Sequence, residues 1–139
     1  MENIMCLEFI NKSENESFAR MVATAFVTRL NPTMEEIAEI KTAISEAVTN
    51  AIIHGYENTV GMVRMEGKIS GSTVEYTITD RGCGIADIKK AREPLYTGKP
   101  ELERSGMGFS IMESFMDSVE VSSSPGMGTT IRLTKVIGK

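Results

Sequence analysis

The chain has 139 residues, a formal net charge of -4, one histidine, two cysteines and no tryptophan. One domain over residues 1–139 can bury a core without disulfides, so we expect Cys6 and Cys83 to be reduced thiols in a cytoplasmic protein. A single histidine excludes a multi-histidine metal centre. No apolar run approaches the roughly 18 residues that a membrane-spanning helix needs. The acidic net charge argues against direct nucleic-acid binding.

One strand and two long helices are predicted in the first part of the chain. Residues 4–10 are predicted to form a strand, because they are mostly apolar and partly alternating. The pattern Ser13-x-x-Glu16 is typical of a capping box and predicts a helix from there to about residue 30. After an Asn-Pro break, Thr33-x-x-Glu36 predicts a second capping box and a helix that Gly55 ends.

The second part of the chain is predicted to contain strands over 60–69 and 73–79, a helix over 106–117, and strands over 119–123 and 129–136. Between them, residues 81–105 are irregular, with a short helix near 87–92. Because the strands come as neighbouring pairs, we expect antiparallel or mixed pairing. This order predicts an α+β fold, a two-layer sandwich with a mixed sheet and helices on one face.

The first chemically suggestive motif, Glu46-x-x-x-Asn50, lies on the helix predicted to end at Gly55. The apolar stripe of that helix has steps of three and four and contains Ile37, Ile40, Ile44, Val48 and Ala51. Glu46 and Asn50 are four residues apart, so they share a face turned away from this stripe. The carboxylate can take a proton and the amide oxygen can coordinate Mg²⁺. By itself, such a pair is also typical of a solvated helix surface.

Two glycine-containing motifs follow. Asp80-Arg-Gly82-Cys-Gly84 comes directly after a predicted strand, where a carboxylate can accept a hydrogen bond from an amino group such as that of adenine. Gly106-Met107-Gly108 stands at a predicted helix start, where free N–H groups favour phosphate. Taken singly, the first also fits a plain turn and the second a flexible helix start. Neither motif has the spacing of a P-loop or a dinucleotide-binding fingerprint.

The irregular stretch from Arg81 to Ser105 is locally basic in an acidic protein. Between Arg81 and Arg104 there are six basic and four acidic residues, whereas the helix with Glu46 is acidic. Loops of about 20 residues in compact domains are commonly functional lids. A basic lid suits an anionic ligand, although a solvated charged loop has the same composition.

Together and in this order, the motifs resemble the nucleotide-binding boxes of the GHKL superfamily, the ATP-binding fold of DNA gyrase B, the heat-shock 90 chaperones and histidine kinases. Glu46-x-x-x-Asn50-Ala-x-x-His54 resembles its N box. Asp80-x-Gly82-x-Gly84 resembles its first glycine box and Gly106-x-Gly108 its second, while Gly128-Thr129 resembles a further glycine–threonine element. The resemblance implies that the protein binds ATP or ADP together with Mg²⁺.

The resemblance also implies roles for single residues. Glu46 would be the general base, Asn50 would coordinate Mg²⁺ and Asp80 would bind the adenine amino group. A lid would cover the site with residues of about 85–105. The other nucleotide-binding residues implied are Gly82, Gly84, Thr97, Lys99, Arg104, Ser105, Gly106, Met107, Gly108 and Thr129.

Nearly the whole chain further resembles a family of small anti-sigma serine kinases of spore-forming bacteria, most clearly over 15–20, 45–56 and 99–109. This resemblance implies a homodimer that, with ATP bound, holds a sporulation sigma factor of the sigma F type inactive. It also implies phosphorylation of a serine on an anti-anti-sigma factor. Arg20 would contact one of these partners, although its spacing from Glu16 also fits a surface ion pair.

Three alternatives remain open at this point. The protein could be a general-stress anti-sigma kinase of the same family, with another sigma factor as its target. It could be a non-enzymatic binding module gated by ATP, in which Glu46 is only surface. The catalytic domain of a histidine kinase is disfavoured, because the one histidine, His54, lies inside the N box and no phospho-acceptor histidine is left.

Overall fold

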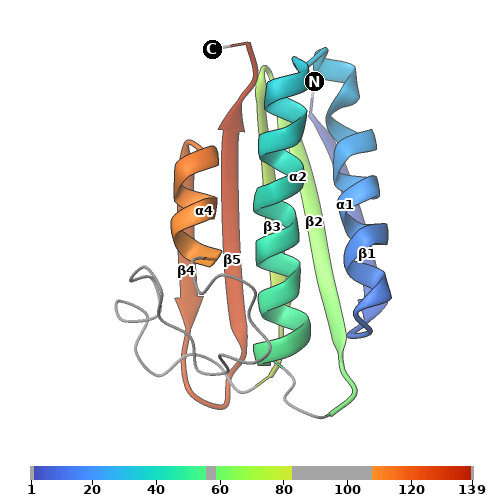
Figure 1. Ribbon diagram of the computed structural model, residues 1–139, viewed down its shortest axis with the longest axis vertical. Coiled ribbons are helices and arrows are strands. Elements are labelled where there is room, and N and C mark those ends of the chain that lie inside the picture. Colours follow the sequence, from blue (N-terminus) through green and yellow to red (C-terminus); the bar gives the residue numbers. More distant parts are fainter. Residues whose placement is uncertain (1, 56–58, 83–107, 139) are drawn as a thin grey trace.

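The computed structural model describes residues 2–55, 59–82 and 108–138, which form one sheet covered on one face by helices (Figure 1). The strand order is β1-β2-β3-β5-β4. Every pair of neighbours in this order is antiparallel. The strands are β1 (Asn3–Ile10), β2 (Met62–Ser70), β3 (Thr73–Asp80), β4 (Ser118–Ser123) and β5 (Thr129–Val136).

The predicted two-layer α+β architecture is confirmed, whereas the expectation of a mixed sheet is wrong for the described strands. The reason is the path of the chain between β3 and β5. Helix α4 (Gly108–Phe115) runs back along the sheet, β4 returns in the opposite direction, and β5 reverses once more (Figure 1). β5 is therefore antiparallel both to β4 and to β3, its two neighbours.

Two longer helices precede β2 and lie over the same face as α4 (Figure 1). Helix α1 (Glu14–Val27) continues into a 3₁₀ turn, η1 (Thr28–Leu30). Helix α2 (Met34–Thr49) occupies the middle of the layer, in contact with α1 on one side and α4 on the other. It continues without a break into a wider π-helical turn, η2 (Asn50–Gly55).

Only one of the two predicted capping boxes exists. The Thr33 hydroxyl accepts a hydrogen bond from the Glu36 N–H at 3.0 Å, and the Glu36 carboxylate accepts one from the Thr33 N–H at 2.9 Å. At the start of α1, Ser13 makes no side-chain cap, so that prediction is wrong. The backbone of Ser13 is already helical, with φ -57° and ψ -31°, whereas a capping residue needs an extended backbone.

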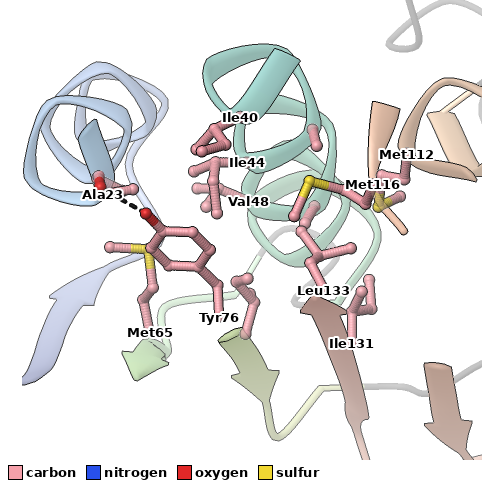
Figure 2. Packing of buried hydrophobic residues seen from close by; sticks show 14 of the residues in the cluster. Ala23, Ile40, Ile44, Val48, Met65, Tyr76, Met112, Met116, Ile131 and Leu133 are labelled. Carbon is pink, nitrogen blue, oxygen red and sulfur yellow. Dashed lines mark hydrogen bonds between the residues drawn. The ribbon is translucent and has the colours of Figure 1, made fainter. Parts of the chain in front are cut away.

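The core lies between the sheet and the three helices (Figure 2). Alternation along β3 turns Val74, Tyr76 and Ile78 toward the helices. The ring of Tyr76 packs edge-on against Phe26, and its hydroxyl donates a 2.6 Å hydrogen bond to the main-chain oxygen of Ala23. This bond satisfies a polar group that would otherwise be buried without a partner.

Two methionines of α4 fill one end of the core. Met112 and Met116 of α4 are buried against the sheet (Figure 2), and Met107 lies outside the described residues. Cys6 is an exposed free thiol, and Cys83 lies outside the described residues. In the part of the chain that the structure describes, no helix is long and apolar enough to cross a membrane.

Candidate functional site

The predicted site residues lie on elements that begin or end at the same end of the molecule (Figure 1). Helix α2 and strand β3 finish there, and β5 and α4 start there. Asp80 is the last residue of β3, Thr129 the first of β5 and Gly108 the first of α4. The antiparallel register makes Asp80 and Thr129 direct neighbours. Asp80 and Thr129, 49 positions apart in the sequence, therefore lie side by side at this end.

Asp80 is a buried carboxyl group, with 3% of its surface exposed. Burial raises its pKa above the ordinary value, and the N–H groups of Gly82 and Thr129 oppose this rise by donating hydrogen bonds to it. The Gly82 N–H lies 2.9 Å from Oδ1. Two backbone donors hold the carboxylate in place, and its remaining lone pairs can accept a hydrogen bond from a ligand amino group.

A row of polar residues extends from Asp80 across two more strands on the helix-covered face. Thr129 pairs with Asp80 on one side and with Ser123 of β4 on the other. The hydroxyl of Ser123 lies 2.8 Å from that of Thr129 and 2.9 Å from the main-chain oxygen of Gly128. Sequence reasoning missed Ser123, because only the pairing of β4 with β5 brings it to this row.

Gly128 was noted in the sequence only as a neighbour of Thr129, yet it is a structural part of the site. Its φ of +82° lies in the left-handed region. A Cβ added there would overlap the main-chain oxygen of Asp80 and lie 2.7 Å from the Cα of Arg81. Only glycine therefore allows the β4–β5 hairpin to approach the end of β3 this closely.

Glu46 and Asn50 lie on the flank of α2 that faces α4, and both side chains are half-buried. Asn50 is the residue at which the α-helix widens into η2, and its N–H bonds to the carbonyls of both Ala47 and Glu46. The π-helical turn lies against β3, the strand that ends in Asp80. Such turns are rare and frequent at functional sites. The sequence carries no signal for it, since the prediction was one uniform helix.

The donor set on α2 fits Mg²⁺ held jointly with a phosphorylated ligand. Mg²⁺ commonly takes one or two protein oxygens and completes its shell with water and phosphate oxygens. The amide oxygen of Asn50 can supply one ligand and lies on the same flank as the carboxylate of Glu46. The described residues contain no cluster of three or more His, Cys, Asp or Glu that could hold a metal alone.

The glycine pair at the start of α4 is described only in part. Gly108 begins the helix and is half-buried, and Phe109 beside it is buried in the core. The other positions of the predicted site and lid stay predictions, because they lie outside the described residues: Gly84, Thr97, Lys99, Arg104, Ser105, Gly106, Met107 and the remainder of 85–105. The side chain of His54 also lies outside the description.

A cavity of about 440 Å³ opens beside Asp80. Most of its lining comes from the hairpin end and from a second cross-strand row, Thr79, Thr130 and Ser122, on the face of the sheet without helices. Asp80 itself faces the helices. The cavity thus lies behind the predicted adenine contact and does not coincide with it.

Arg20 lies on α1, beside α2 and away from Asp80. Its Nη1 is 3.3 Å from Oε2 of Glu16 and donates to the hydroxyl of Ser45 at 3.2 Å. The predicted ion pair with Glu16 is confirmed. The Arg20 side chain is 37% exposed, so part of the guanidinium still reaches solvent.

Comparison with known proteins identifies the family. Residues 10–135 match the family described as "Histidine kinase-like ATPase domain". The chain is 59% identical over 140 residues to the anti-sigma F factor of Bacillus subtilis (strain 168), covering 100% of this chain and 96% of that protein. It is 57% identical over 136 residues to the anti-sigma F factor of Thermoanaerobacter pseudethanolicus, with coverage of 98% and 95%.

A third relative, the anti-sigma F factor of Clostridium kluyveri, is 55% identical over 135 residues and covers 97% of this chain and 95% of that protein. The matched region includes both the row from Asp80 to Ser123 and the Glu46–Asn50 flank. The chain therefore belongs to the histidine kinase-like ATPase family and, within it, to the anti-sigma F factors.

Proposed function

We propose that this protein is an ATP-dependent serine kinase that also sequesters a sigma factor of the sigma F type. The observation that carries the proposal is the juxtaposition of a buried carboxylate at the end of β3 with a carboxylate–amide pair at the end of α2. Full-length identity of 55–59% to proteins named anti-sigma F factor supports the choice of sigma factor. It favours this reading over a general-stress relative.

In this proposal the two ends of ATP are recognised by different elements. Asp80 accepts a hydrogen bond from the adenine amino group, and Gly82 and Gly84 allow the ring to approach the backbone. Thr129 supports Asp80 through its N–H group. Gly108, at the start of α4, presents its N–H group to the phosphates, and the preceding Ser105, Gly106 and Met107 are assigned to the same contact from their motif. Thr97, Lys99 and Arg104 of the lid contribute further contacts to the phosphates.

The chemical step needs positioning and charge neutralisation more than covalent chemistry by the protein. The carboxylate of Glu46 takes the proton from a serine hydroxyl of the anti-anti-sigma factor. The serine oxygen then bonds to the γ-phosphorus of ATP while the bond to the β-phosphate oxygen breaks, so ADP leaves. Asn50 would hold Mg²⁺, which would supply neutralisation of the phosphate charge when bound.

The partners in this proposal are a sigma factor, the anti-anti-sigma factor and a second copy of the chain. Binding of a protein partner is supported by the exposed side of α1. There Phe18 and Met21, which are 48% and 67% exposed, are close to Arg20 in the sequence. Exposed apolar side chains beside a partly exposed cation are typical of a protein-binding surface. We assign Arg20 to contact with one of the two protein partners.

A phosphotransfer assay tests the kinase half. The protein is incubated with ATP labelled at the γ-phosphate and with the candidate anti-anti-sigma factor, and phosphoserine is measured. We expect transfer by the wild type and, in Glu46→Gln, a loss of turnover of about 100-fold or more with ATP binding retained. The matched control is Glu35→Ala, which removes an exposed carboxylate from the first turn of the same helix, far from the site.

The outcomes separate the alternatives. No transfer to serine by the wild type would leave a binding module gated by ATP. Equal turnover in Glu46→Gln and wild type would remove Glu46 from the mechanism. Capture of purified sigma factors, each tested with and without ATP, distinguishes a sporulation target from a general-stress target, because only one should bind tightly.

A further inference from the structure

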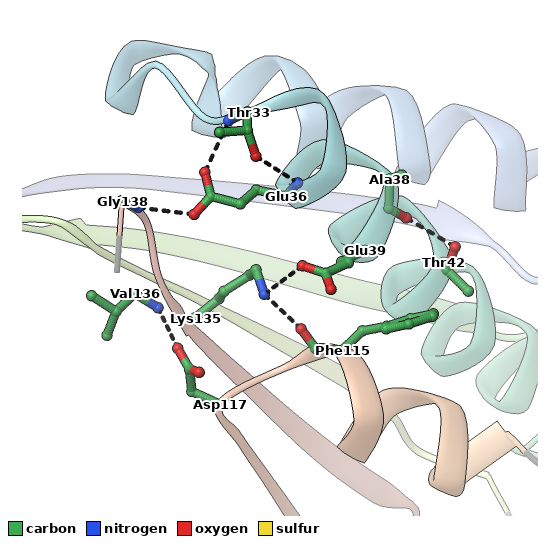
Figure 3. Close-up of polar contacts among 10 residues, drawn as sticks. All are labelled: Thr33, Glu36, Ala38, Glu39, Thr42, Phe115, Asp117, Lys135, Val136 and Gly138. Carbon is green, nitrogen blue, oxygen red and sulfur yellow. Dashed lines mark hydrogen bonds and ion pairs between the residues drawn. The ribbon is translucent and has the colours of Figure 1, made fainter.

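A buried lysine joins three elements at the opposite end of α4 from the candidate site (Figure 3). Lys135 lies on β5, and its side chain is only 10% exposed. Its Nζ donates a 2.7 Å hydrogen bond to the main-chain oxygen of Phe115, the last residue of α4. The same Nζ lies 3.1 Å from Oε1 of Glu39 on α2. One ammonium group therefore ties β5, α4 and α2 together.

This contact has a clear electrostatic reason. The carbonyls of the last helical turn have no partners within the helix, and they carry partial negative charge. A lysine at this end satisfies one such carbonyl and interacts favourably with the helix dipole. Burying the ammonium is costly unless it is paired, and Glu39 supplies the compensating charge. The Nζ position is thus determined by two partners at once.

Two more hydrogen bonds fix the same end of α4 to β5. The N–H of Asp117 donates to the main-chain oxygen of Thr134 at 2.9 Å. The Asp117 carboxylate accepts from the N–H of Val136 at 2.7 Å (Figure 3). Residues 115–117 are therefore anchored to 134–136. Phe109 and Met112 hold α4 against the core by packing, which restrains a shift along the helix axis less than hydrogen bonds do.

The anchored end determines where the other end lies. Helix α4 has eight residues and spans about 12 Å, so it acts as a short rigid rod. Its first residue is Gly108, part of the proposed phosphate-binding segment. Glu39 lies seven residues, about two turns, before Glu46 on the same flank of α2. Through Glu39, Lys135 sets α4 against the flank that carries the proposed general base.

We propose that Lys135 is a positioning residue for phosphoryl transfer. It holds the C-terminal end of α4 in register with α2 and β5, and so sets the distance between the phosphate-binding end of α4 and the Glu46–Asn50 pair. The inference rests on the proposed function and adds a residue that lies outside the nucleotide motifs. Loss of the Lys135 ammonium should therefore weaken binding of the phosphates of ATP. It should leave binding of adenine unchanged, because that depends on Asp80.

The test compares ATP with adenosine, which lacks phosphates. Lys135→Met keeps the aliphatic stem and removes the ammonium. We expect ATP affinity and kcat to fall about tenfold each, because small displacements of reacting groups are costly, while adenosine affinity stays within about twofold. Lys135→Arg retains a donor and should restore most of the loss. Binding is measured by calorimetry and kcat by phosphotransfer.

The control for a merely structural effect is Tyr76→Phe. It removes the buried hydrogen bond to Ala23, on the half of the core away from α4, and should lower stability without changing either affinity. If Lys135→Met weakens ATP and adenosine equally, or leaves both at wild-type affinity, the inference is overturned. If that variant does not fold, Glu39→Gln decides the question, since an unchanged ratio of ATP to adenosine affinity would contradict positioning.

Different measurements test the nucleotide site and the role of Lys135. A wild-type protein that binds no ATP removes the nucleotide site itself. A wild-type protein that binds ATP and transfers phosphate, combined with an unchanged affinity ratio in the Lys135 and Glu39 variants, removes only the positioning role.

Discussion

Gly128 and Asp80 are in contact through their backbones, 48 residues apart in the sequence. No Cβ fits at Gly128, because it would overlap the main-chain oxygen of Asp80 and approach the Cα of Arg81 to 2.7 Å. The carboxyl group of Asp80 is held by two backbone donors, of which Thr129 follows directly after Gly128. The position of the proposed adenine contact therefore depends on a glycine in a different hairpin.

Gly128→Ala should displace the end of β3 and weaken both folding and ATP binding. We expect a loss of about 2–3 kcal/mol in unfolding free energy, from left-handed strain plus overlap with backbone. Urea unfolding and ATP calorimetry measure the two effects. The matched control is Gly126→Ala, because Gly126 also has a positive φ of +76° but nothing within 4 Å of an added Cβ. Equal effects of the two substitutions would show that the contact with Asp80 is unimportant.

Asp80→Asn should weaken ATP binding by roughly 10- to 100-fold, the value of a hydrogen bond to a charged acceptor. The replacement keeps the volume of the side chain but puts an NH₂ group where an acceptor is needed. Calorimetry with ATP and with adenosine should show similar losses, because both carry the adenine amino group. Wild-type affinity for either ligand would remove Asp80 from the site.

The stability of wild type relative to Asp80→Asn should depend on pH. Burial raises the pKa of Asp80 above its ordinary value of 3.8, so the folded state holds the proton more strongly than the unfolded state. Ionisation of Asp80 therefore lowers the unfolding free energy at neutral pH. This destabilisation disappears as the pH falls through the raised pKa toward 3.8. The stability of wild type relative to Asp80→Asn should increase on acidification. Unfolding curves from pH 7 to pH 4 give this difference, and a decrease would contradict it.

The capping box at Thr33 predicts the opposite pH dependence. Hydrogen bonds from the N–H groups of Thr33 and Gly138 lower the pKa of Glu36 below 4.5. Its contribution to stability is therefore present above pH 4.5 and is lost as the pH falls through the lowered pKa. Glu36→Ala should cost about 1 kcal/mol at pH 7 and progressively less below pH 4.5. Glu35→Ala, an exposed acid in the same turn, is the control and should cost little at either pH.

The two capping boxes also show how far local sequence predicts this fold. Thr33-x-x-Glu36 follows an Asn–Pro break that leaves Thr33 extended, with ψ of 165°, and the pattern is correct. Ser13-x-x-Glu16 has the same letters, but the chain arrives from β1 in a tight turn that makes Ser13 helical. Glu16 pairs with Arg20 in place of the cap. The pattern is identical, and the preceding backbone decides the outcome.

In the candidate site, residues that share one motif could be singled out from the sequence, whereas residues that strand pairing brings together were missed. Asp80 and Asn50 stand out from their own motifs. Ser123 and the close approach of Gly128 depend on β5 lying between β3 and β4, which no local pattern specifies. Lys135 looks like an ordinary strand lysine in the sequence, because its two partners come from separate helices. Long-range register is thus the part that sequence reasoning lacked.

Arg20 calls for a double variant, because its removal affects the fold as well as a partner. Oε2 of Glu16 is buried, and Arg20 is the cation beside it at 3.3 Å. Arg20→Ala alone leaves this carboxylate buried without a countercharge, which should cost about 1–3 kcal/mol. Glu16→Gln combined with Arg20→Ala removes the stranded charge and should recover part of that stability in urea unfolding.

The double variant then isolates the role of Arg20 in binding. If the guanidinium contacts the sigma factor or the anti-anti-sigma factor, Glu16→Gln with Arg20→Ala should bind that partner at least about tenfold more weakly than Glu16→Gln alone, a difference of about 1.4 kcal/mol. Calorimetry with each purified partner in the presence of ATP measures this difference. Equal affinity of the two variants for both partners would mean that Arg20 serves only to neutralise Glu16 and to bind Ser45 across the α1–α2 interface.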